Sequence, residues 1–158
     1  MKTSFKTGLS FGLTSGVITT LGLMVGLHSG THSRTVVVGG IVTIAVADAL
    51  SDALGIHIAE ESRNNGVVSE IWESTIATFA AKFLIAMTFV APVLLLPLGE
   101  AMVVSVVWGF MLLVGLSYFL ALAQQIPAWK VIAEHAVIGM SVIAITHYVG
   151  GWIHSALG

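Results

Sequence analysis

The stretch VADALSDALGIHIAEES, residues 46–62, places Asp48 and Asp52 in an apolar run with no other charge before Glu60. The whole chain extends this character, because 56% of its 158 residues are hydrophobic, 9% are charged and its mean hydropathy is +0.99. A soluble domain has about a quarter of its residues charged. Eight acidic and six basic residues are too few to cover a water-soluble globule of this size. The composition therefore predicts an integral membrane protein.

A helix needs about 20 mostly apolar residues to cross a bilayer, and five segments of the chain, one of which includes most of this stretch, are long enough. They are residues 8–28, 35–59, 74–97, 100–123 and 131–154. The first follows a basic start like that of a signal peptide, but it is long enough to span and lacks a small-residue cleavage site, so we expect a mature helix. The connections are short. We therefore expect one all-α transmembrane domain over residues 1–158, built as a five-helix bundle.

Basic residues near the ends of the spans predict the orientation of the chain in the membrane. Four fall on the N-terminal side, at Lys2, Lys6, Arg63 and Lys130, and Arg34 falls on the other. The N-terminus should then be cytoplasmic, and the C-terminus should lie outside. The net charge of −2 argues against nucleic-acid binding. Since the chain has no cysteine, disulfides and thiolate metal sites are excluded. No nucleophile–base motif or phosphate loop is present, so we do not expect an enzyme.

The two aspartates are the first candidates for function. They lie one helical turn apart, so they project from one face, in the predicted cytoplasmic half of the second span. An acid inside the membrane costs about 2.5–3.5 kcal/mol on insertion scales and usually marks an ion path, a proton relay or a buried pair. Two acids on one face require a cation or a proton between them. Carboxylates suit hard ions such as Mn(II), Fe(II) or Mg(II). The alternative is that Ser and Thr hydroxyls or protonation satisfy the pair.

Five further residues surround the predicted cytoplasmic loop after the second span, and they could collect metal ions: His57, Glu60, Glu61, Glu70 and Glu73. A solvated acidic rim is an equally good interpretation of the loop residues.

The remaining candidates lie within other spans. Glu134, in the fifth span, lies at a depth comparable with Asp52 and could be a further metal ligand or a proton carrier. Lys82 could pair with an acid such as Glu134 or extend to the membrane interface. The hydroxyls of Ser15 and Thr19 could line a path or bond to the helix backbone.

A glycine repeat in the first span and three histidines are the last candidates, the first for helix contacts and the second for cofactor binding. Gly8, Gly12 and Gly16 follow one another every four residues, which lets another helix approach closely, within the bundle or in a dimer. His147, together with His28 or His135, could instead bind a haem or a quinone.

Four segments together resemble the vacuolar iron transporter family, in its small prokaryotic, nodulin-like form. The second span contains ADALSDALG, similar to the family's ADALSMGLGEYLS-type motif, and the first contains TSGVITTLGLMVGL, similar to NDGLVSTASLMLGV. The third span, FAAKFLIAMTFVAPVLLLPL, and the last, EHAVIGMSVIAITHYVGGWI, resemble the family's corresponding helices. The likeness covers nearly the whole chain and keeps the order of the five spans.

The resemblance implies a homodimer of five-helix chains in a prokaryotic inner or plasma membrane. Such a dimer would carry Fe(II) or Mn(II) out of the cytosol in exchange for protons. In that family the path lies near the dimer axis and is lined by the first and second spans. By position, Asp48 matches the family's second-span acid, and Ser51 and Gly55 also match, which implies that Ser51 lines the path.

Three departures from the family pattern stand out. Ser15 replaces an acid of the first span. Asp52 replaces a methionine and Ile56 replaces an acid, so a carboxylate has moved from the first helix to the second. The family's cytoplasmic metal-binding domain is reduced to SRNNGVVSE, for which the glutamates of the loop could be a minimal substitute.

We therefore expect a divalent metal transporter that uses Asp48, Asp52 and Glu134, with no resident cofactor beyond the transported ion. The alternatives are a non-transporting metal sensor or scaffold, or a membrane subunit that binds haem or quinone.

Overall fold

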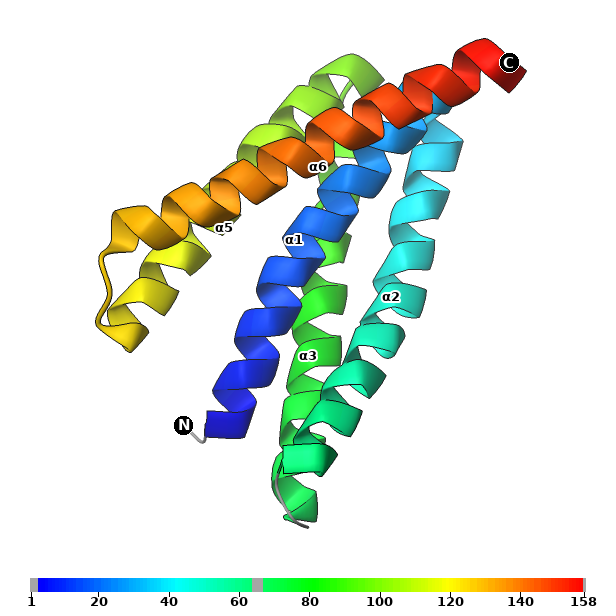
Figure 1. Ribbon diagram of the computed structural model, residues 1–158. Coiled ribbons are helices and arrows are strands. Elements are labelled where there is room, and N and C mark those ends of the chain that lie inside the picture. Colours follow the sequence, from blue (N-terminus) through cyan, green and yellow to red (C-terminus); the bar gives the residue numbers. More distant parts are fainter. Residues whose placement is uncertain (1–2, 64–66, 158) are drawn as a thin grey trace.

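The computed structural model describes residues 3–63 and 67–157, and nearly all of them are helical (Figure 1). Lys2, which contributed to the predicted orientation, lies outside these residues. The elements are α1 (Thr3–Thr31), α2 (Arg34–Arg63), α3 (Val68–Thr88), α4 (Val90–Leu95), α5 (Leu98–Gln124) and α6 (Ala128–Leu157).

Five helical segments are long and apolar enough to cross a membrane: Ser4–Thr31, Arg34–Arg63, Val68–Leu95, Leu98–Gln124 and Ala128–Leu157. They coincide with the five predicted spans: four extend beyond the predicted bounds by one to four residues at each end, and the third begins at Val68 rather than residue 74 and ends at Leu95 rather than residue 97. The prediction of an all-helical, multi-pass membrane protein is therefore confirmed for the described part of the chain.

The third span is interrupted at Phe89, where α3 ends and α4 begins. Pro92 explains the interruption because it has no N–H to donate to the Thr88 carbonyl, and its ring crowds that carbonyl. The Phe89 N–H donates instead to the Ala86 carbonyl at 3.1 Å, in a tighter turn. The Thr88 hydroxyl accepts a hydrogen bond from the Trp108 indole at 3.1 Å, which ties the break to α5.

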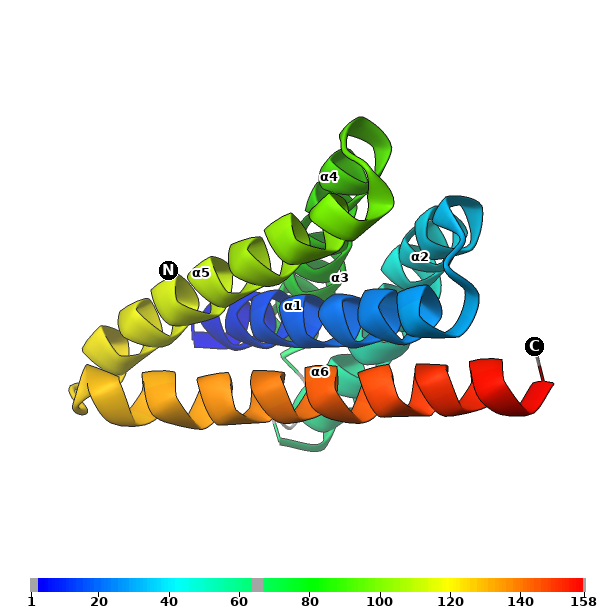
Figure 2. The same ribbon diagram turned by 90° about the horizontal axis from the view of Figure 1, so that it is seen from above.

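Helix α1 lies at the centre of the bundle, in contact with α2, α3, α5 and α6. Helices α2 and α3 cover one side of it. Helices α5 and α6 run antiparallel on the other side and diverge from the turn that joins them (Figure 2). The hydrophobic core follows from this arrangement, and it is centred on Val17, Leu21 and Met24 of α1 with residues of α2, α4 and α5 around them.

The glycines of α1 serve contacts within the bundle. An added Cβ would lie 2.6 Å from the Thr78 carbonyl oxygen at Gly12 and 3.2 Å from the Lys82 Cα at Gly16. The backbones of α1 and α3 therefore touch along this stripe, as small residues permit between membrane helices. Toward the C-terminus of α1 the close contact depends on Gly150 of α6, where an added Cβ would lie 2.2 Å from the Gly26 carbonyl oxygen.

Candidate functional site

A charged cluster lies where α1, α2 and α3 meet. Lys82 of α3 extends toward both aspartates of α2. Its ammonium lies 2.6 Å from Asp48 Oδ2 and also contacts Asp52 Oδ2. It donates a hydrogen bond to Ser15 Oγ at 2.9 Å, and Ser15 Oγ in turn donates to Asp52 Oδ2 at 2.8 Å. The cation that the two acids require is thus supplied by the chain itself, and Lys82 pairs with the aspartates rather than with Glu134.

The two aspartates differ in how well they are satisfied. Asp52 accepts hydrogen bonds from both Lys82 and Ser15. Asp48 Oδ2 is buried and has an ion pair but no hydrogen bond of acceptable geometry. With all groups ionised, two carboxylates and one ammonium leave the cluster with one excess negative charge. An uncompensated charge inside a membrane-spanning segment is costly.

Local sequence features explain how the cluster forms. Gly16 allows the backbone of α3 to approach α1 at Lys82, so the lysine stem passes beside Ser15. Asp48 lies near the middle of α2, and Ser15 and Lys82 lie near the middle of their own spans. Thr19 lies one turn from Ser15, and its hydroxyl donates to the Ser15 carbonyl at 2.9 Å, so in the structure it bonds to the backbone of its own helix.

The cluster is closed on one side and open on the other. The Lys82 side chain is only 2% exposed, whereas those of Asp48 and Asp52 are 28% and 23% exposed. The aspartates therefore lie at the edge of the three-helix contact, next to the outward face of α2. Ser51 is on that outward face and is exposed.

The five residues expected around the loop between α2 and α3 do not converge on one point. His57 Nδ1 lies 3.0 Å from Thr75 Oγ1. Glu60 is buried and pairs with Arg63 of its own helix at 3.4 Å, while Glu61 is exposed. The other two glutamates, Glu70 and Glu73, are half-buried on the first turns of α3.

Glu134 lies apart from the aspartates. It is exposed near the start of α6, which packs on α1 and α5. Its neighbour His135 faces α5, where its Nδ1 lies 2.7 Å from Ser117 Oγ. Among residues 3–63 and 67–157, no three or more His, Asp or Glu side chains form a group that could hold a metal ion in the orientations they adopt in the structure. The metal-ligand roles of the candidate acids therefore stay predictions.

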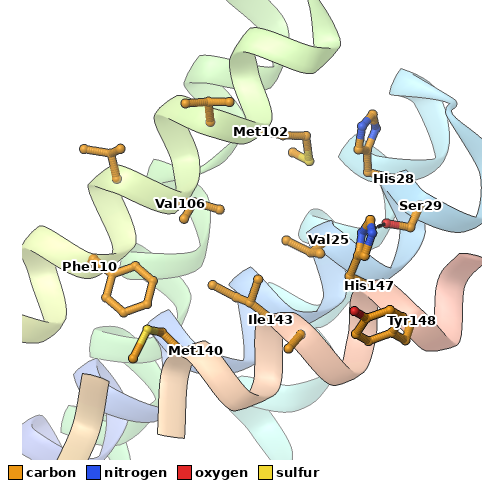
Figure 3. A pocket seen from close by; sticks show the side chains of 13 residues that line it. Val25, His28, Ser29, Met102, Val106, Phe110, Met140, Ile143, His147 and Tyr148 are labelled. Atoms are coloured by element: carbon orange, nitrogen blue, oxygen red, sulfur yellow. Dashed lines mark hydrogen bonds between the residues drawn. The ribbon is translucent and has the colours of Figure 1, made fainter. Parts of the chain in front are cut away.

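A second notable site is a cavity of about 640 Å³ between α1, α5 and α6 (Figure 3). Its walls are mostly apolar, with Phe110 and Met140 toward one end. His28 and His147 lie at the other end, where His147 Nδ1 is 2.6 Å from Ser29 Oγ. Of the two histidine pairings expected for haem or quinone, the structure brings together His147 and His28.

Lys82 stands out in the sequence because the rest of its predicted span is uncharged, but no sequence pattern indicates which residues it contacts. Comparisons of the chain with protein-family models, with curated protein sequences and with solved structures each find no match.

Proposed function

We propose that this protein transports a divalent metal ion, Fe(II) or Mn(II), across the membrane and out of the cytosol in exchange for protons. The observation that supports this most is the excess of one carboxylate over ammonium at the Lys82 cluster. An intramembrane acid pair with an unbalanced charge is the kind of site at which protons and metal ions compete. The resemblance of the chain to vacuolar iron transporters points to the same function.

In this proposal, the Lys82 ammonium and the transported ion compete for the same two carboxylates. A divalent ion bound between Asp48 and Asp52 balances both carboxylates, and it repels the ammonium from its place between them. The lysine head is a compact charge on a flexible stem, so it can withdraw along α3 and return when the ion leaves. Binding is then favourable but reversible, as conduction requires. A proton on either carboxylate balances the metal-free cluster, so metal release and proton uptake are linked.

We further propose that two copies of the chain pair along α2. On its exposed face, beside a row of larger apolar residues, this helix carries a row of small, exposed residues at four-residue intervals: Gly39, Thr43, Ala47, Ser51 and Gly55. A Cβ added at Gly39 or Gly55 would meet nothing within 4 Å, so the face has no partner in the described chain. Small residues at this spacing let membrane helices approach closely. Pairing here would cover the open side of the aspartates and enclose a path between the copies.

Two other functions each have one observation in their favour. A non-transporting sensor or scaffold is favoured by the internal pairing of both aspartates with Lys82. Haem or quinone binding is favoured by the shared cavity of His28 and His147. Absorption spectra of the purified protein test the haem version directly, because a bound haem gives a Soret band.

The transport proposal is tested with proteoliposomes that contain one dye for metal and another for pH. Wild-type protein should move Mn(II) and Fe(II) with a counterflow of protons. The double variant Asp48→Asn with Asp52→Asn should lower both fluxes to the leak of protein-free liposomes, because it removes both carboxylates. Glu100→Gln is the matched control, since Glu100 is an exposed acid at the start of α5.

The outcomes separate the candidates. If the double variant transports both ions as fast as the wild type, the aspartates are not the transport site. Stoichiometric metal binding without flux in the wild type would favour the sensor or scaffold instead.

A further inference from the structure

At the end of the bundle opposite the N-terminus, two histidines from the end of α1 meet one from the end of α6: His28, His32 and His154. The C-terminal ends of α1 and α6 lie together there (Figure 1). The ring centres of His28 and His32 are 5.4 Å apart, and those of His32 and His154 are also 5.4 Å apart. Two imidazoles that share a tetrahedral metal ion, each with a metal–nitrogen bond of about 2.0–2.1 Å, have their centres about 5 Å apart. Each of these two pairs therefore has the ring separation of joint ligands, and the three side chains must turn for their nitrogens to share one ion.

The hydrogen bonds around these rings leave ligand atoms free. His154 Nδ1 lies 3.1 Å from the Gly30 carbonyl oxygen. A carbonyl only accepts, so this nitrogen carries the proton and Nε2 keeps its lone pair. Metal-binding histidines are held in the same way by a backbone carbonyl. His28 Nδ1 is buried and has no hydrogen-bond partner. His32 and His154 are exposed, so their rings can turn toward a common ion.

The backbone at His32 provides an independent observation. This residue follows the end of α1 with a φ of 51°, in the left-handed region. Glycine is the usual residue at such a helix end, because a side chain there is strained. Strain that the chain retains at one position is a pointer to function at that position. Here it directs an imidazole between His28 and His154.

We propose that His28, His32 and His154 bind one transition-metal ion of the Zn(II) type, with water completing the coordination. Imidazole nitrogens suit such borderline ions, whereas the carboxylates of the Lys82 cluster suit harder ones. His147 is not part of the set, because its ring packs against Tyr148, with centres 5.8 Å apart, outside the ring contacts that join His28, His32 and His154. The site lies at the end of the membrane spans rather than at their middle. It does not depend on the transport proposal.

The test is the zinc content of the purified full-length protein, prepared without a polyhistidine tag. Samples in detergent are dialysed against Zn(II) at neutral pH, and bound metal is counted by mass spectrometry. We expect one Zn(II) per chain in the wild type and its loss in His32→Gly. Since glycine relieves the strain at this position, this variant should fold at least as well as the wild type.

Two controls match this variant. Gln125→Gly changes a second non-glycine residue with a positive φ, 57°, and should keep the zinc. His135→Ala removes a histidine from the opposite end of α6 and should also keep it. An Asp48→Asn, Asp52→Asn variant should bind the same zinc even where transport is lost, so failure of the two proposals can be distinguished. Absence of bound zinc in the wild type, or equal zinc in wild type and His32→Gly, overturns the inference.

Discussion

Replacing Lys82 with methionine is the most direct test of how the membrane-embedded charges are balanced. Methionine keeps the length of the stem and removes the ammonium that contacts both aspartates. Asp52 retains its hydrogen bond from Ser15, whereas Asp48 is left without a partner. The variant should therefore be destabilised by uncompensated charge and not by lost volume.

The size of the effect can be worked out in two ways. Removing one partner from a buried ion pair costs about 3–5 kcal/mol. Both Oδ2 atoms contact one nitrogen, so they lie within about 5 Å of each other, where two unit charges repel by about 3 kcal/mol at an effective dielectric constant of about 20. The two values agree. At about 2–4 °C per kcal/mol for a chain of this length, the melting temperature should fall by about 6–20 °C.

The assay is thermal unfolding of the purified variants in one detergent. The triple variant Lys82→Met, Asp48→Asn, Asp52→Asn removes every charge of the cluster and should regain most of the loss, because neutral replacement of a buried ion pair is often tolerated. Lys130→Met is the control, since Lys130 is exposed at the start of α6. The reasoning is refuted if Lys82→Met melts with the wild type, or if the triple variant melts no higher than Lys82→Met.

Two further variants, each with a control, test the helix contact and the hydrogen bonds that form the charged cluster. Gly12→Ala should destabilise the protein by about 1–3 kcal/mol, because the added methyl group overpacks against the Thr78 carbonyl. Gly115→Ala in α5 is the control, since its methyl group meets open space and should not destabilise the protein. Equal melting temperatures of the two variants in thermal unfolding would contradict the close α1–α3 contact. Ser15→Ala removes a hydroxyl bonded to two charged groups and should cost about 1–3 kcal/mol, while Ser105→Ala removes a buried hydroxyl with no partner and should be neutral or stabilising. Chemical unfolding of the two serine variants measures this difference, and a reversed order would argue against the Ser15 hydrogen bonds.

The sequence alone was sufficient to predict that the chain is an all-helical membrane protein and where its five spans lie. Hydropathy over about 20 residues reports whether a helix can lie in lipid, and this property depends on each segment by itself. The sequence also predicts that Asp48 and Asp52 lie on one face of α2, because helical geometry alone points residues four apart in nearly the same direction. The break at Phe89 follows from Pro92 for the same reason, although the third span was predicted as continuous.

The partners of these residues were decided only by the tertiary structure. Lys82 lies 30 residues from Asp52 and 67 from Ser15, and sequence patterns do not state which helices become neighbours. Glu134 was one acid with which Lys82 could have paired, but it lies near the start of α6, which packs on α1 and α5. The glycines of α1 could have served a dimer or the bundle, and their contact with α3 places Lys82 beside the aspartates. A charge inside a membrane must be balanced, and the packing of three helices determines by which group.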